Sequence, residues 1–277
     1  MPLTTVGGIE LYYELLDCTE PWRSGPDPVV FIHGLGGDHR MWLYQVPAFC
    51  ARYPTVTINL RGHGRSARPD AEWSIADMAR DIVRLLRSIG VERAHLIGLS
   101  LGGLVAQQFA LDYPFATASL VLVGTFASIP DANRDATSAS LRFIEENGMA
   151  VVAAERIRNA FSDHVDPVMR DYFIDRVAQN HKPSYVRAAR AAMSFASTDR
   201  LGELALPVLV MVGEEDRVTP PPLSEALARH IVGARLARIA GAGHLTNLER
   251  PMEFNRLVLE FLDGLEESRR SAVGSPQ

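Results

Sequence analysis

The 277-residue sequence has few cysteines and no excess of positive charge. Only Cys18 and Cys50 occur, far apart in the sequence and without the spacing of a metal site, so we expect two reduced thiols. The formal net charge of −5 gives no electrostatic reason to expect a nucleic-acid partner. Internal repeats and low-complexity tracts are not visible, and the 22% share of charged residues is typical of a globular enzyme rather than a disordered chain.

Long apolar runs are also missing. No run approaches the roughly 20 residues that cross a membrane, so we expect no membrane partner. The opening stretch MPLTTVGGIELYYEL lacks the basic start and apolar segment of a signal peptide. We therefore expect a cytoplasmic protein, and the sequence leaves its oligomeric state open.

The sequence does contain a regular alternation of strand-like and helix-like segments. Apolar, β-branched runs predict buried strands, and apolar residues at three- and four-residue spacing between Ser74 and Gly90 predict an amphipathic helix. The predicted strands are 9–16, 27–34, 54–60, 94–100, 118–124, 207–213 and 234–240, and the predicted helices are 74–90, 101–113 and 251–265. This alternation predicts an α/β fold with a mostly parallel central sheet flanked by helices on both faces.

The middle of the chain has a different character. Residues 126–200 contain no convincing strand and are rich in alanine and arginine. They are predicted to form several helices, separated by Pro130, Gly148, Pro167 and Pro183. We expect this segment to be an inserted helical cap above the carboxyl ends of the strands, where ligands bind in such sheets. Residues 1–125 and 201–265 then form the core, and the polar residues 266–277 a flexible tail.

The stretch GLSLGG, residues 98–103, lies between a predicted buried strand and a predicted helix. Ser100 is either a nucleophile or a polar residue in a turn. Glycines on both sides relieve the crowding at the apex of a tight strand-to-helix turn, which is the setting that a G-x-S-x-G pattern requires for catalysis. The helix that follows also directs free N–H groups toward the site. We therefore predict that Ser100 is the nucleophile.

A serine hydroxyl needs a base to accept its proton. His244 lies in GAGHLTNLERP, after the last predicted strand, where Gly241, Ala242 and Gly243 allow the loop to approach the sheet closely. A histidine in a loop is more often simply solvated, but this position predicts the base. The other histidines, His33, His39, His63, His95, His164, His181 and His230, have no companions that indicate this role.

The base in turn needs an acid to orient it. VMVGEEDRVTPP offers Glu214, Glu215 and Asp216 directly after a predicted buried strand. Two of the three are expected to be solvated, and we predict that Asp216 is the acid. The order Ser100, Asp216, His244 is the one expected when the nucleophile turn lies in the middle of the sheet.

These segments resemble the α/β-hydrolase fold superfamily over roughly residues 9–265. The matching motifs are HGLGG (33–37), RGHGRS (61–66), GLSLGG (98–103), GEEDRVTP (213–220) and GAGHLTNLERP (241–251). The resemblance implies the same nucleophile, acid and base. It also implies an oxyanion hole made by the backbone N–H groups of Leu35 and Leu101. His33 would then shape the site without taking part in the chemistry.

The family contains several chemistries. A serine nucleophile disfavours dehalogenases and epoxide hydrolases, whose nucleophile is an aspartate. HGLGGDHRMW (33–42) is similar to 3-oxoadipate enol-lactonases and related esterases, although those lactonases usually have serine at the position of Gly34. Carbon–carbon bond hydrolases of aromatic catabolism have Ser-Gly-Pro-Gly where this chain has Leu-Gly-Gly-Asp.

The predicted function is a serine hydrolase that cleaves a small-molecule carboxylic ester or lactone through an acyl-enzyme, with no metal or organic cofactor. An enol-lactonase or carbon–carbon hydrolase is the enzymatic alternative. A hydrolase-like ligand-binding receptor with little turnover is the alternative from another class, and turnover of a simple ester distinguishes it.

The cap should select the substrate. Besides His33 and Trp42, the predicted substrate-binding residues are Phe126, Phe161, Met193 and Phe195, although packing within the cap would explain each of these four cap residues equally well. Arginines also crowd this segment, among them Arg156, Arg158, Arg187 and Arg190. Most are expected on solvated helix faces, but one that points inward would select a carboxylate-bearing substrate. The sequence favours an uncharged ester.

Overall fold

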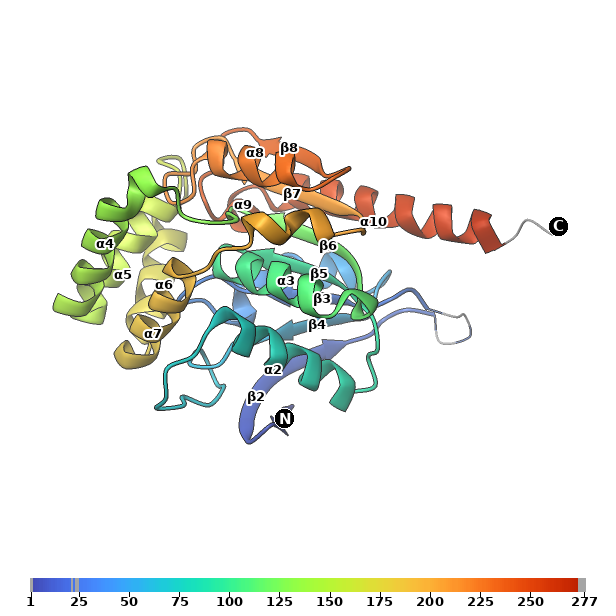
Figure 1. Cartoon of the computed structure of the whole chain (residues 1–277), viewed down its shortest axis with the longest axis horizontal. Helices are drawn as coiled ribbons and strands as arrows, with labels where there is room; N and C mark the ends of the chain where they lie inside the picture. Colours follow the sequence, from blue (N-terminus) through green and yellow to red (C-terminus); the bar gives the residue numbers. More distant parts are fainter. Residues whose placement is uncertain (1, 21, 23–24, 274–277) are drawn as a thin grey trace.

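The computed structural model describes residues 2–20, 22 and 25–273 (Figure 1). It contains an eight-stranded sheet in the order β1-β2-β4-β3-β5-β6-β7-β8. Its strands are β1 (Leu3–Val6), β2 (Ile9–Leu16), β3 (Val29–Ile32), β4 (Thr55–Ile58), β5 (Ala94–Leu99), β6 (Thr117–Val123), β7 (Val208–Gly213) and β8 (Arg235–Ile239). The pairs from β4 to β8 are parallel, and β1 and β2 form an antiparallel edge. The predicted mostly parallel sheet is confirmed.

Helices cover both faces of the sheet. They are α1 (Val46–Phe49), α2 (Ile75–Ser88), α3 (Leu101–Asp112), α4 (Arg134–Glu146), α5 (Met149–Ala160), α6 (Pro167–Ala178), α7 (Lys182–Met193), α8 (Pro221–His230), α9 (Thr246–Glu249) and α10 (Pro251–Val273). Apolar side chains of α2, α3 and α8 join one buried cluster, and those of α1, α9 and α10 join the other. Along β3, Val30 and Ile32 face the first cluster while Val29 and Phe31 face the second, so the strand is buried on both sides.

The helix α2 forms where its sequence signals predict it. The Ser74 side chain accepts a hydrogen bond from the N–H of Asp77, and the Asp77 carboxylate accepts one from the N–H of Ser74. This capping box satisfies N–H groups that have no partner inside the helix. Gly90, with φ of +77°, follows the end of the helix in a conformation that glycine adopts without strain.

Four helices, α4 to α7, lie in the sequence between β6 and β7, and Figure 1 shows them grouped at one end of the sheet. We call these four helices the cap. Their apolar residues continue the cluster on the α10 side of the sheet, so the cap packs against the core. The boundaries of a cap at residues 126 and 200 stay a prediction.

The structure differs from expectation near both ends of the chain. The strand β1 was not predicted, because its four residues alternate in burial too briefly to stand out. The last helix continues to Val273 instead of ending near residue 265. The expected tail is therefore helical as far as Val273, and its added turns place Arg269 3.3 Å from the Asp27 carboxylate. Residues 274–277 lie outside the described residues.

The two cysteines are close in space although far apart in sequence. The N–H of Cys18 donates to the carbonyl of Cys50 at 3.0 Å, and both thiols are free.

No helix in the described part of the chain has the length and apolar character needed to span a bilayer.

Candidate active site

Ser100 occupies a strained turn between β5 and α3. Its φ of 55° is the only positive value among the described non-glycine residues, and such strain is kept where function requires it. The N–H of Ser100 donates to the carbonyl of Val123 at 2.8 Å, and its own carbonyl accepts from the Thr125 hydroxyl at 3.0 Å. The Ser100 side chain makes no capping hydrogen bond to α3, so its hydroxyl is not engaged in holding the helix.

The two flanking glycines are required by close backbone contacts. A Cβ atom on Gly98 would lie 2.3 Å from the carbonyl oxygen of Gly102. A Cβ atom on Gly102 would lie 2.1 Å from the carbonyl oxygen of Ile32, on the neighbouring strand β3. Both distances are far below van der Waals contact, so the turn packs against the sheet only when these positions lack side chains.

Asp216 and His244 form a buried pair at the ends of neighbouring strands β7 and β8. His244 Nδ1 lies 2.8 Å from Asp216 Oδ2, while Glu214 and Glu215 make no hydrogen bond to the histidine among the described residues. The pairing at Nδ1 leaves Nε2 of His244 for other chemistry. Both side chains are almost inaccessible to solvent, at 4% and 5% exposure, so their interaction is little screened by water.

Three further donors hold the Asp216 carboxylate. The N–H groups of Val218 and Thr219 each donate to Oδ1 at 2.8 Å, and the Thr219 hydroxyl donates to Oδ2 at 2.9 Å. Burial alone would raise the pKa of Asp216, but the charge and hydrogen bond of His244, with the Thr219 donors, hold that pKa below its usual value. Asp216 is therefore fixed as a carboxylate facing the imidazole. Sequence reasoning missed Thr219, although it lies three residues after the acid.

The loop that carries His244 is anchored to the cap. The N–H of His244 donates to the carbonyl of Ala160 at the end of α5 at 2.7 Å. The carboxylate of Glu249 accepts from the N–H groups of Gly243 and Ser162, each at 3.0 Å. Burial raises the pKa of Glu249, and these donors act in the opposite direction. The position of the histidine thus depends on the cap as well as on the sheet.

His33 positions the loop after β3. The N–H of Leu60 donates to its Nε2 at 3.0 Å, which leaves the proton on Nδ1, 2.7 Å from the carbonyl oxygen of Gly34. Burial lowers the pKa of His33 to about 3, so the ring is neutral. In a trans peptide the C=O and the following N–H point in opposite directions. Fixing the Gly34 carbonyl on His33 therefore directs the N–H of Leu35 to the other side.

The structure leaves the two predicted oxyanion donors free. Among the hydrogen bonds of the described residues, none uses the N–H of Leu35 or Leu101 as donor. Leu35 lines the same cavity as Ser100 and His244. Leu101 begins α3, where N–H groups lack partners inside the helix. Both donors remain available to an oxygen bound beside Ser100.

Ser100 and His244 line one cavity between the sheet edge and the cap. Its empty space, open mouth included, is about 840 Å³, within the range that holds a small ligand. The hydrogen bonds of the described residues do not include one between Ser100 and His244, and such bonds are often long before substrate binds. The apolar wall is formed mainly by Leu35, Met41, Leu99, Ile157, Phe173 and Val177.

The six predicted substrate-binding residues do not line this cavity, so these predictions are corrected. His33 is fully buried behind the loop that it positions, and Trp42 packs against Phe31 with ring centroids 4.8 Å apart. Phe161 is buried beside Phe173, which lines the cavity in its place. The remaining three lie elsewhere: Phe126 packs against the core on the α3 side, and Met193 and Phe195 line a separate hollow of the cap.

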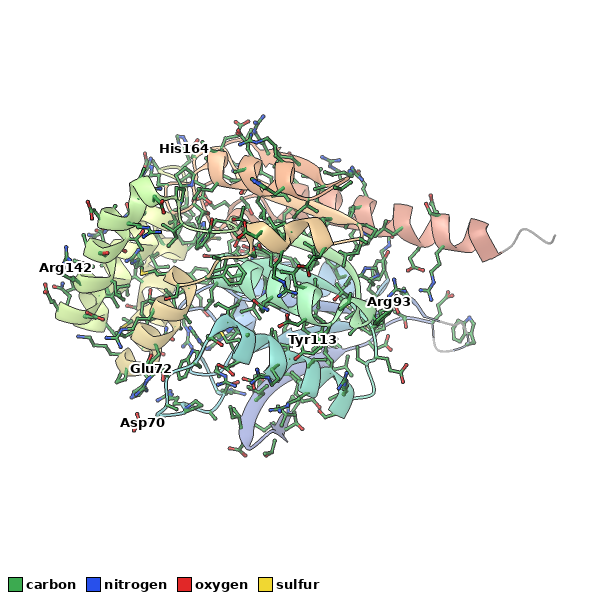
Figure 2. The ribbon with its side chains drawn as sticks, in the orientation of Figure 1. Asp70, Glu72, Arg93, Tyr113, Arg142 and His164 are labelled. Carbon is green, nitrogen blue, oxygen red and sulfur yellow. The ribbon has the colours of Figure 1, made fainter. Side chains whose placement is uncertain are left out.

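The remaining histidines do not enter the cavity. His164 is exposed on the surface, as Figure 2 shows. His63 is buried beside His33, with ring centroids 5.1 Å apart, and burial lowers its pKa to about 4. Among the described histidines, His244 is therefore the one that lines the cavity with Ser100.

Potential metal ligands do not gather at this site. In the described part of the chain, the one group of three possible ligands is Asp27, His95 and Glu266. Asp27 and His95 lie at the amino ends of β3 and β5, opposite to Ser100, and Arg93 lies at the same end, away from the cap (Figure 2). Arg93 and Arg269 each lie 3.3 Å from the Asp27 carboxylate, so two cations already neutralise this group.

Known proteins resemble this chain over most of its length. A sequence model described as "Alpha/beta hydrolase family" matches residues 29–257. The protein named 3-oxoadipate enol-lactonase 1 of Acinetobacter baylyi is 28% identical over 249 residues, which cover 88% of this chain and 92% of that protein. The putative carbamate hydrolase RutD of Variovorax paradoxus is 34% identical over 260 residues, which cover 90% and 95%. The crystal structure of the enol-lactonase from Burkholderia xenovorans matches with a TM-score of 0.87 at 26% identity, over 95% of this chain and 100% of that one.

Proposed function

The chain belongs to the alpha/beta hydrolase family and is a hydrolase, and from that premise we propose that it cleaves a carboxylic ester or lactone through an acyl-enzyme on Ser100. The observation that carries the proposal is the 2.8 Å contact between His244 Nδ1 and Asp216 Oδ2 in the cavity that Ser100 lines. A base oriented by a buried acid, beside a serine in a strained turn, is the arrangement that activates a hydroxyl.

The proposed reaction has two halves. The Ser100 hydroxyl attacks the substrate carbonyl carbon while His244 Nε2 accepts its proton, and the N–H groups of Leu35 and Leu101 bind the oxygen that becomes negative. The intermediate collapses as His244 returns the proton to the leaving alkoxide. His244 then takes a proton from water, which attacks the acyl-enzyme, and returns that proton to the Ser100 oxygen as the acid is released. Asp216 orients the imidazole and stabilises its positive charge throughout.

The relatives support the substrate class at this level. The names 3-oxoadipate enol-lactonase and carbamate hydrolase both describe enzymes that break a bond between an acyl carbon and a heteroatom. An enol-lactone is therefore a specific second candidate among esters and lactones. The proposal includes a small-molecule substrate and action in the cytoplasm, and the free thiols of Cys18 and Cys50 fit a reducing compartment.

Turnover of 4-nitrophenyl butyrate by the purified full-length chain tests the proposal. We expect saturable hydrolysis by the wild type and loss of roughly four or more powers of ten in kcat for Ser100→Ala. Ser194→Ala is the matched control, because this exposed serine directly follows α7 and, among the described residues, its hydroxyl bonds to the Arg190 carbonyl alone. Hydrolysis by Ser100→Ala at the wild-type rate would contradict the proposal, and no turnover of any ester or lactone would favour the receptor alternative.

A further inference from the structure

The catalytic cavity carries more positive than negative charge, although the whole chain has a net charge of −5. Arg40, Arg156 and Arg176 line it, and Asp38 is the one carboxylate among its lining residues. Arg40 binds Asp38 with two nitrogens, at 2.5 and 3.1 Å, and Arg176 lies 3.3 Å from the same carboxylate. Burial alone would raise the pKa of Asp38, but the hydrogen bonds and charge of Arg40 hold it well below its usual range. Two of the three arginines thus share one ionised partner.

Arg156, on the cap helix α5, is the arginine without a counter-ion. Among the ion pairs of the described residues, none includes it. One terminal nitrogen donates to the hydroxyl and the carbonyl of Ser140 on α4. Its Nε is buried and has no hydrogen-bond partner in the described part of the chain. The other terminal nitrogen, Nη1, is not a donor in any hydrogen bond of the described residues, so its N–H groups remain unused.

The neighbouring groups do not neutralise this charge. Tyr185 on α7 also lines the cavity, and burial raises the pKa of its phenol to about 12, against the opposing charge of Arg156, so the phenol is neutral. Glu145 on α4 binds Arg190 at 2.7 Å. Glu155, on the same helix as Arg156, faces solvent and accepts from Asn159. The charge of Arg156 therefore has no ion-pair partner among the described residues.

An uncompensated cation in a partly desolvated cavity is costly unless an anion binds beside it. A carboxylate is the partner whose flat, two-oxygen shape matches the guanidinium. We propose that Arg156 binds a carboxylate carried by the substrate, so that the enzyme prefers anionic esters or lactones to uncharged ones. This inference rests on the proposed function, because it places the anion in the cavity where Ser100 attacks. It reverses the preference for an uncharged ester that the sequence alone favours.

Matched substrate pairs test the inference by kinetics. Mono-4-nitrophenyl glutarate and 4-nitrophenyl butyrate differ by a carboxylate in the acyl half, and 3-acetoxybenzoate and phenyl acetate differ by one in the alcohol half. We expect the wild type to prefer the anion in one of the pairs. Arg156→Gln should lower kcat/KM for that anion roughly 10- to 100-fold, mainly through KM, and change kcat for the uncharged ester by less than about threefold.

Two further variants separate charge from structure. Arg156→Lys keeps the charge but loses the fork of donors, so it should restore only part of the preference. Arg158→Gln is the matched control, because Arg158 lies on the same helix and is exposed. It should leave both members of each pair unchanged. Equal losses for the charged and uncharged esters in Arg156→Gln would show a structural role and overturn the inference.

A binding measurement makes the inference independent of turnover. Calorimetry gives the Kd of monomethyl glutarate for Ser100→Ala, for Ser100→Ala/Arg156→Gln and for Ser100→Ala/Arg158→Gln. We expect the Kd to rise roughly tenfold or more in the variant that lacks Arg156, and in that variant alone. Equal affinities, or no binding of the anion by Ser100→Ala, overturn the inference even where simple esters are hydrolysed. Failed ester hydrolysis by the wild type would instead contradict the proposed function, and this binding comparison would still decide the role of Arg156.

Discussion

The carboxyl edge of the sheet and the helical cap line the same cavity, but their polar groups are paired to different degrees. At the sheet edge, Asp216 accepts hydrogen bonds from Val218, Thr219 and His244. On the cap, Arg156 bonds Ser140 through one terminal nitrogen, and its charge has no ion-pair partner among the described residues. Groups that hold one another keep a fixed geometry, as chemistry requires, whereas an unpaired group is free to bind a ligand. The difference supports our proposal that the sheet supplies the reaction and the cap supplies the selectivity.

The largest effect expected is on the sheet side. His244→Ala should lower kcat by several powers of ten, and adding Ser100→Ala should cost little more, because the two residues act as a unit. Asp216→Asn should cost roughly 10³- to 10⁴-fold, since the amide no longer stabilises the imidazolium. The measurement is kcat for each variant on an uncharged ester, compared with that of the wild type.

Glu215→Gln is the matched control for the acid, because Glu215 lies next to Asp216 and makes no hydrogen bond to His244 among the described residues. It should keep wild-type kcat. If Glu215→Gln were the damaging change and Asp216→Asn were harmless, the assignment of the acid would be wrong.

A second prediction concerns the packing of the backbone around the Ser100 turn rather than the chemistry of the side chains. Gly102→Ala places a Cβ atom 2.1 Å from the Ile32 carbonyl oxygen, so something must move. We expect a loss of stability above about 3 kcal/mol, seen as low folded yield and a lower Tm. Gly264→Ala, in α10 with open space around the new atom, should stabilise by about 0.5–1 kcal/mol. A Gly102→Ala protein as stable as wild type would show that the turn is not tightly packed.

The sequence predicts the sheet side much better than the cap, and the reason is physical. Ser100 is determined by a local pattern, a strand, a turn with two glycines and a helix, and Asp216 and His244 follow predicted strands whose ends meet at one edge. Which face of a cap helix points inward depends on tertiary packing, which residue spacing does not show. Both Phe161 and Phe173 are aromatic residues of the middle segment, and the sequence gives no reason to choose between them. Of the two, only Phe173 lines the cavity.

The same limit applies to contacts between distant segments. The Glu249 carboxylate binds the N–H of Gly243, six positions away, and the N–H of Ser162, 87 positions away. No sequence motif predicts these contacts. Thr219 could have been found, because a hydroxyl three residues after an acid is well placed to donate to it. The unpaired state of Arg156 could not, since it depends on where every neighbouring carboxylate points.

The smallest effect expected is on acid stability, at the end of the sheet away from the cap. Burial lowers the pKa of His95 to about 4, from the ordinary value of 6.5 that applies to the unfolded chain. The folded state thus favours neutral His95, so its contribution is complete above about pH 6.5 and is lost as pH falls toward 4. This loss is on the order of 2–3 kcal/mol.

His95→Gln should flatten the fall of Tm between these pH values and leave kcat on the uncharged ester unchanged. Because His95 lies opposite the catalytic edge, a large change in kcat would show that the two ends of the sheet are coupled, against the separation of roles described above. An unchanged slope of Tm against pH would show that other groups control the acid response.

The central claim, a serine nucleophile activated by the Asp216–His244 pair, is tested most directly by the mass of a covalent adduct. The purified chain is treated with a fluorophosphonate, which reacts with activated serines, and the labelled peptide is identified by mass spectrometry. We predict one adduct, on Ser100, that forms at least about a hundredfold more slowly in His244→Ala. Labelling of another residue, or labelling of Ser100 at the same rate without His244, would contradict the claim.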